Sequence, residues 1–208
     1  AGIKQGVAAG PLSGQADLSF FMSQNKDMIE YFLATYEGQV GFRATNIEQS
    51  RVYGGEFELI LNGTFGDLGM MLNGGYTFTY PVEFNAITNR STGDFLKYRR
   101  KHSGKMSVSA SWKRIECEVS LYARSKILRI DSFFLNQETG EVILPGFPDY
   151  WEEHNTGYFL MDLSAGYRLN DIFTISVAVK NLTNTEYMGR PGDIQAQRNY
   201  SLRLSARF

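Results

Sequence analysis

The sequence predicts an all-β chain, an antiparallel meander of about nine strands. Three observations support this fold class. Apolar and polar residues alternate with a period of two along most of the 208 residues, as expected for strands with one apolar face. Many of the alternating runs are longer than the strands of soluble sandwiches, which typically hold about 5–6 residues. The segments between the runs are short and long in turn, as in a meander whose tight turns share one rim.

The first four strands are expected at residues 2–9, 15–32, 41–61 and 66–80. In the second of these, Ala16, Leu18, Phe20 and Met22 share one face, and in the fourth the face is formed by the even positions from Leu68 to Tyr80. Turn residues lie from Gly10 to Gly14 and from Asn62 to Gly66, whereas 33–40 is a long connection.

Five further strands are expected at residues 97–112, 115–131, 156–169, 172–187 and 197–208. In the eighth strand Phe173, Ile175, Val177 and Val179 alternate with polar or small residues, and in the last strand the apolar positions are Tyr200, Leu202, Leu204, Ala206 and Phe208. Lys113-Arg114 and Asn170-Asp171 are short connections, and 81–96, 132–155 and 188–196 are expected to be long loops.

The two faces of these strands predict a transmembrane β-barrel. A tilted strand crosses a bilayer with roughly 9–11 residues, a length that most runs exceed. Charged residues would have to be buried in a soluble sandwich: Glu116, Glu118, Arg168, Lys180, Arg203 and Arg207. In a barrel the apolar face contacts lipid and the charged face lines the lumen. Val177 and Phe208 are therefore expected on the convex surface, and aromatic residues near strand ends are expected to form interfacial girdles.

Composition and motifs exclude several other classes. The formal net charge is −1, which does not favour nucleic-acid binding, and the single cysteine, Cys117, excludes a disulfide scaffold and a four-cysteine zinc site. The chain contains two histidines and no motif of a hydrolase, metalloprotease or nucleotide-binding site. Glu152, Glu153 and His154 are adjacent and make a poor metal-ligand set. We expect no enzymatic activity, no bound metal, no cofactor and no nucleic-acid partner.

Several strings then resemble one family. Asn181-Leu182-Thr183-Asn184-Thr185-Glu186-Tyr187 resembles a box near the end of the penultimate strand of TonB-dependent outer-membrane receptors, and Arg198 to Phe208 resembles their last strand. Tyr53-Gly54-Gly55-Glu56 and Gly2-Ile3-Lys4 resemble elements further upstream, in the same order. Asp193 departs from the family, which often has arginine after the Pro191-Gly192 pair.

The resemblance implies that residues 1–208 are the C-terminal part of a barrel of about 22 strands, without the plug domain and the TonB box. It implies a bacterial outer-membrane receptor that takes up a scarce nutrient, a small molecule or metal chelate such as a ferric siderophore, haem, a cobalamin or a glycan. Energy would come from the TonB complex, through parts outside this segment. Further implied partners are outer-membrane lipid and the barrel-assembly machinery.

The resemblance also suggests roles for particular residues. Phe147, Tyr150 and Trp151, in the expected loop 132–155, could stack on an extracellular ligand. Tyr200, Leu202, Leu204 and Phe208 resemble the signal for barrel assembly. Asn181, Leu182 and Tyr187 belong to the family box, where Asn181 is expected to bind backbone groups. The basic run from Lys97 to Lys101 is either a solvated strand end or a contact for phosphates of surface lipopolysaccharide or of an anionic ligand.

Two other readings stay open from the sequence. A complete small outer-membrane barrel acting as a pore or enzyme requires an even strand number. A soluble β-sandwich binding module requires the apolar faces to pack on each other.

Overall fold

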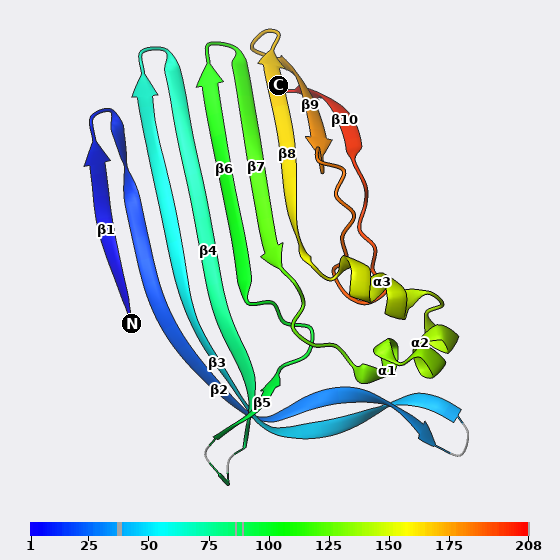
Figure 1. The fold of residues 1–208 in the computed structure, drawn as a ribbon. Helices are drawn as coiled ribbons and strands as arrows, with labels where there is room; N and C mark the ends of the chain where they lie inside the picture. Colours follow the sequence, from blue (N-terminus) through cyan, green and yellow to red (C-terminus); the bar gives the residue numbers. More distant parts are fainter. Residues whose placement is uncertain (37–38, 86, 89, 208) are drawn as a thin grey trace.

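The chain forms one curved antiparallel sheet with a small helical cap at one end (Figure 1). The computed structural model describes residues 1–36, 39–85, 87–88 and 90–207. In the described part the sheet has 10 strands, in the order β1-β2-β3-β4-β6-β7-β8-β9-β10, and β5 pairs with β4 off this path. The strands are β1 (Gly2–Ala9), β2 (Leu12–Tyr36), β3 (Gln39–Phe65), β4 (Leu68–Asn85), β5 (Arg90–Phe95), β6 (His102–Trp112), β7 (Ile115–Ser125), β8 (Gly157–Arg168), β9 (Phe173–Lys180) and β10 (Asn199–Ala206).

The tight turns and the long connections lie at opposite rims of the sheet, as expected (Figure 1). The turns β1–β2, β3–β4, β6–β7 and β8–β9 form the short-turn rim. The connections β4–β6, β7–β8 and β9–β10 lie at the other end, the long-loop rim. The predicted all-β meander is therefore confirmed.

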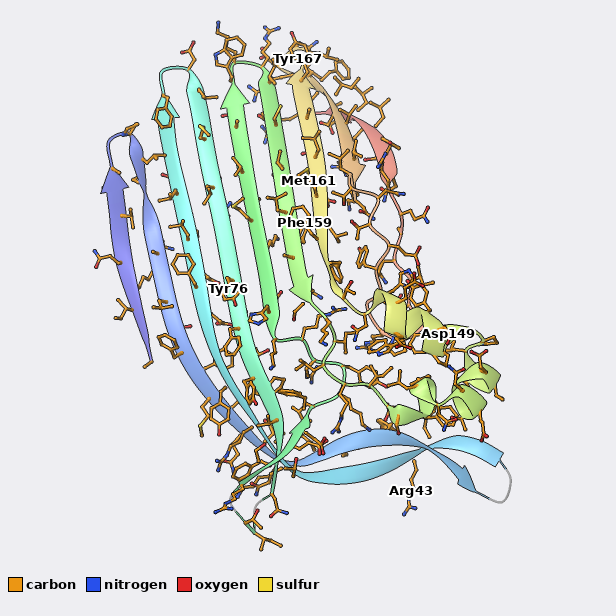
Figure 2. The ribbon with its side chains drawn as sticks, viewed as in Figure 1. Arg43, Tyr76, Asp149, Phe159, Met161 and Tyr167 are labelled. Carbon is orange, nitrogen blue, oxygen red and sulfur yellow. The ribbon has the colours of Figure 1, made fainter. Side chains whose placement is uncertain are left out.

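The register of the strands separates the side chains, which Figure 2 draws as sticks, into one polar and one apolar face. Directly paired residues in an antiparallel sheet point to the same side. One row across the sheet is largely polar and runs through Ser13, Asn62, Met71, Ser109, Glu118 and Ser164. The neighbouring row on the other face is apolar and runs through Leu61, Leu72, Val108, Val119, Leu163, Val179 and Tyr200.

Along the middle of the strands, no described residue covers the apolar face. At the long-loop rim, Val82 and Phe84 on the same face of β4 are only 4% and 5% exposed. Leu202 is 71% exposed and Val177 is 50% exposed, although both stand in the middle of strands. A sandwich would bury these side chains against a second sheet, and the described chain has only one sheet. The sheet is also open, with β1 and β10 at its edges, so the small closed barrel does not fit it either.

Four connections differ from the sequence prediction, three of them through the ends of their strands. The hairpin of β2 and β3 remains paired as far as Tyr36 and Gln39, well beyond the last β3–β4 pair at Ser50 and Glu83. It therefore forms a two-stranded arm that extends away from the sheet (Figure 1). The expected loop 81–96 contains the end of β4 and the short strand β5, because the chain turns back on β4 at the rim. β9 ends at Lys180 rather than near 187.

The expected loop 132–155 is folded into three short helices, α1 (Ser132–Leu135), α2 (Gln137–Ile143) and α3 (Phe147–His154). The side chain of Asn136 accepts hydrogen bonds from the backbone N–H groups of Glu138 and Thr139, which caps α2. Pro148 lies in the first turn of α3, where its missing N–H costs no helical bond. No helix in the described residues is long and apolar enough to cross a membrane.

Candidate ligand path and outer loops

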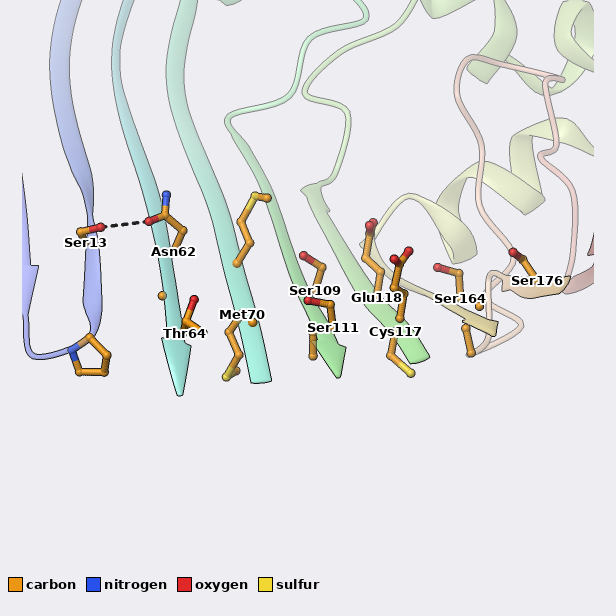
Figure 3. A pocket seen from close by; sticks show the side chains of 18 residues that line it. Ser13, Asn62, Thr64, Met70, Ser109, Ser111, Cys117, Glu118, Ser164 and Ser176 are labelled. Carbon is orange, nitrogen blue, oxygen red and sulfur yellow. Dashed lines mark hydrogen bonds between the residues drawn. The ribbon is translucent and has the colours of Figure 1, made fainter. Parts of the chain in front are cut away.

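The polar face of the sheet is hollowed near the short-turn rim (Figure 3). The hollow has a volume of about 860 Å³ and extends across strands β2 to β9. Its polar lining consists mostly of small side chains: Ser13, Asn62, Thr64, Ser109, Ser111, Glu116, Glu118, Ser164 and Ser176. A hollow of this width requires the concave side of a curved sheet, so the polar face is concave and the apolar face is convex. Val177, which is on the apolar face by register, therefore lies on the predicted side.

The two glutamates of this wall are held by neighbouring side chains. Arg168 Nη2 lies 3.3 Å from Glu116 Oε1, and Ser120 Oγ donates to Glu118 Oε1 at 2.9 Å. Glu116 and Arg168 are both more than half exposed, so this ion pair adds little stability. Its position on the concave face gives the wall polar groups that a hydrated solute can contact.

The helical cap has its own hydrophobic core at the long-loop rim. Its buried members are Ile127, Ile130, Phe147, Trp151 and Met188, and Phe134, Leu144 and Tyr150 pack against them. Phe147 is 5% exposed and Trp151 is 9% exposed, and the two ring centroids lie 5.9 Å apart. Phe147 and Trp151 thus stack on other protein side chains, and the open surface of the cap is formed by their neighbours.

Tyr150 lies at the edge of this core in a charged environment. Its ring stacks on His154 with centroids 4.1 Å apart and an interplanar angle of 4°. Its buried hydroxyl lies beside Glu186 but has hydrogen-bond geometry to none of the described residues. Burial raises the pKa of Tyr150 to about 12, and the neighbouring carboxyl of Glu186 contributes to the increase. The phenol therefore stays neutral at physiological pH.

A depression of about 370 Å³ lies between the cap helices and the residue after β7. It is lined by Lys126, Leu135, Gln137, Pro148, Trp151, Glu152 and Asn155. The lining combines an indole edge with amide, ammonium and carboxylate groups. Groups of both charges and an aromatic ring thus line one depression.

Two residues join the cap to the strands. The side chain of Asn155 accepts from the backbone N–H of Ile127 at 2.9 Å and donates to its carbonyl at 3.0 Å. Arg100 donates to the carbonyl oxygens of Ser125 and Met188, the latter at 3.0 Å, and its guanidinium lies 5.1 Å from the ring centroid of Tyr158. Burial lowers the pKa of Arg100. The segment after β9 and the cap are therefore anchored to β7 and β8.

Part of the basic run is used within the protein. Lys97 Nζ forms an ion pair with Asp131 Oδ1 at 2.5 Å, and both side chains are mostly buried. Arg129 forms ion pairs with Glu83 and, at 3.2 Å, with Asp94. These contacts join the β4–β5 connection to the segment before α1. Sequence reasoning missed this network because its members are 34 or more residues apart.

The box residue Asn181 is buried at the end of β9 and adopts a left-handed φ of 51°. Its Nδ2 donates to the carbonyl oxygens of Thr185, at 2.8 Å, and Ala196, at 3.3 Å, and its Oδ1 accepts from the N–H of Thr185. Its own N–H donates to Asp162 of β8. Leu182 donates its N–H to the carbonyl of Met161, and the ring of Tyr187 lies 4.5 Å from that of Tyr158.

The other residues singled out in the sequence are placed as follows. Tyr200, Leu202 and Leu204 lie on the apolar face of β10 and are 71%, 71% and 65% exposed. Phe208 lies outside the described residues. His154 Nδ1 and Glu153 Oε2 are 4.0 Å apart, and the described residues hold no group of three or more His, Cys, Asp and Glu side chains that could bind a metal ion.

The concave polar wall and the open meander can now be compared with known proteins. The family model "TonB dependent receptor-like, beta-barrel" matches residues 1–182. The chain belongs to this family. The chain is thus part of a bacterial outer-membrane protein. In such a barrel the convex apolar face is the side expected to meet lipid. No curated protein matches the sequence.

Solved structures show the same fold. The copper transporter OprC superposes on the chain with a TM-score of 0.65, at 13% sequence identity over 100% of the chain. The siderophore receptor PiuA from Acinetobacter baumannii gives 0.61 at 15% identity over 99%, and the ferric-catecholate import receptor Fiu from E. coli K12 gives 0.58 at 19% identity over 99%. The 208-residue chain spans only 30%, 27% and 27% of these three proteins.

Proposed function

We propose that residues 1–208 are the C-terminal wall and outer-loop region of a receptor that actively imports a scarce nutrient across the outer membrane. The observation that carries this proposal is the polar concave wall, hollowed by small side chains, below a folded cap at the long-loop rim. A cap with its own core can hold a ligand-binding surface in place, and a polar wall lets a hydrated solute pass.

The ligand is proposed to be a small molecule or metal chelate: a ferric siderophore, haem, a cobalamin or a glycan. Phe147, Tyr150 and Trp151 would act in ligand capture through the shape of the cap, because Phe147 and Trp151 are buried. The depression beside Trp151, with Lys126 and Glu152, is the proposed first contact. Its groups of both charges suit a polar chelate better than a purely apolar ligand.

The energy for import is proposed to come from the TonB complex through a plug domain and TonB box outside residues 1–208. Support comes from the family and from the share of the solved relatives that the chain spans, between 25% and 30%. Tyr200, Leu202 and Leu204, with Phe208, are proposed to be recognised by the barrel-assembly machinery, because they present an exposed apolar row on an edge strand.

Nutrient-limited growth tests the proposal. A strain lacking the full-length receptor is supplied in turn with ferric siderophores, haem, cobalamin or a glycan as the only source of iron, cobalamin or carbon. We expect one class to fail to support growth, with recovery by the intact receptor but not by a form whose TonB box is deleted. Equal growth on every class, or recovery without the TonB box, contradicts TonB-driven import.

A further inference from the structure

The distribution of charge on the convex face is asymmetric. Among the described residues, the convex positions of β6 to β10 include no aspartate or glutamate. The convex positions of β1 to β4 include none either, up to the pair Lys26–Gln49. Their ionisable side chains other than tyrosine and cysteine are Lys26, Arg51 and His102. All three lie toward the long-loop rim, which is the extracellular end of an outer-membrane barrel.

A compact group of aromatic and basic side chains lies at this rim. Lys101 Nζ is 5.0 Å from the ring centroid of Tyr80 and 4.5 Å from that of Phe95. The two rings meet edge to face with centroids 5.3 Å apart. The next residue, His102, has its ring 5.3 Å from that of Phe78, and its Nδ1 is 2.6 Å from the hydroxyl of Tyr76. These six residues are called the cationic rim below.

The cationic rim combines two features of a membrane interface. Tyrosine and phenylalanine rings settle at the level of the lipid headgroups, and a cation held over such rings keeps its charge close to that level. The Tyr76 contact uses Nδ1 of His102, which leaves Nε2 to donate to a headgroup oxygen. β5 carries Asp94 next to Phe95, and Arg129 lies 3.2 Å from this carboxylate, so its charge is partly neutralised beside the cationic rim.

We propose that Lys101 and His102 bind a phosphate group of an anionic glycolipid in the outer leaflet. A phosphate monoester offers several acceptor oxygens, which suits two adjacent donors, an ammonium and an imidazole. Lys101 lies at a bend before β6, and its ammonium reaches Tyr80 and Phe95. The residues paired with these two, Tyr53 and Val82, belong to the convex face. The aromatic residues of the cationic rim therefore hold both donors on the lipid side of the wall. The interaction is separate from nutrient binding, which takes place on the concave face and the cap.

The test uses the full-length receptor in nanodiscs that contain lipid A, either with both phosphates or with the phosphates removed. Native mass spectrometry measures the lipid A that stays bound after release from the disc. The variants are Lys101→Gln, His102→Gln and their combination. Lys113→Gln is the matched control, because Lys113 Nζ also lies over a ring, 4.8 Å from that of Trp112, but at the short-turn rim.

We expect phosphorylated lipid A to be retained by the wild type and by Lys113→Gln, and roughly fivefold less by each single rim variant. Lys101→Arg is expected to retain it, which separates loss of charge from loss of folding. Equal retention by the wild type and the double variant overturns the proposal. So does equal retention of the phosphate-free lipid, or displacement by millimolar inorganic phosphate, which would indicate a site for free phosphate.

Discussion

The side-chain amide of Asn181 donates a hydrogen bond to the carbonyl oxygen of Ala196, 15 residues further along the chain. The nearby Asn184 also binds this segment: its Oδ1 accepts a hydrogen bond from the N–H of Arg198 at 2.9 Å. Together the two asparagines fix the segment that leads into β10. The family box is therefore a connector between the penultimate and the last strand.

Replacing Asn181 is expected to destabilise this connection. Asn181→Ala removes several buried hydrogen bonds and should cost about 2–4 kcal/mol of unfolding free energy, with slower assembly. Asn181→Asp keeps the acceptor for Thr185 but turns a carboxylate oxygen toward the carbonyl oxygens of Thr185 and Ala196 in a buried position, so a loss at least as large is expected. Urea unfolding in lipid vesicles measures both. Asn170→Ala is the matched control, because the Asn170 side chain also accepts two backbone N–H groups but in an exposed turn. Equal losses at the two sites would contradict the role of the buried bonds.

Truncating Trp151 is expected to unfold the cap and leave the sheet intact. The indole is almost fully buried, so Trp151→Ala leaves a cavity that costs about 3–5 kcal/mol. Hydrogen exchange should increase in α1 to α3 but not in β6 to β8. Val142→Ala, at a position 81% exposed, serves as the control. Unchanged exchange in the cap of Trp151→Ala would refute the assignment of this core.

The cap is expected to loosen at high pH. The folded-state pKa of Tyr150 is raised from 10.0 to about 12, so the folded cap favours the neutral phenol. Its contribution to stability is complete below an unfolded-state pKa of about 10 and is lost as the pH rises through about 12. Trp151 fluorescence in a Trp112→Phe background should show this change, and Tyr150→Phe should remove it. An identical pH profile for Tyr150→Phe contradicts the assignment.

A lysine on the convex face is expected to be far more costly than one on the concave face. Leu163 and Ser164 are adjacent on β8 and point to opposite sides. Leu163→Lys should lose about 2–4 kcal/mol of unfolding free energy in a bilayer, because the ammonium enters the acyl region. Ser164→Lys should change it little. Urea titration in vesicles compares the two, and equal losses would argue against a lipid-facing Leu163.

The sheet and the sides of its strands were predictable because period-two alternation is a local property. Leu61, Val108 and Leu163 carry it across three different strands, and their pairing into one row follows from the turns. The family matches also followed chain order. The sequence could therefore predict which face meets lipid before any contact was known.

The cap was not predictable in the same way. Its helices are short and depend on local features such as Asn136 at the start of α2 and Gly146, with φ of 75°, before α3. An aromatic residue in a loop has the same sequence signature whether it faces a ligand or a core. The burial of Phe147 and Trp151 depends on Met188, which is far away in sequence.

Cys117 provides the most direct test of which face meets lipid. It is the only cysteine of the chain, it is exposed, and it lies on the convex face, whereas its neighbour Glu118 lies on the concave face. A bimane label on Cys117 of the full-length receptor should be strongly quenched by lipids brominated in their acyl chains. A label on Glu118→Cys in a Cys117→Ala background should not be quenched. Quenching of the second label but not the first would contradict a barrel wall with its apolar side toward the membrane.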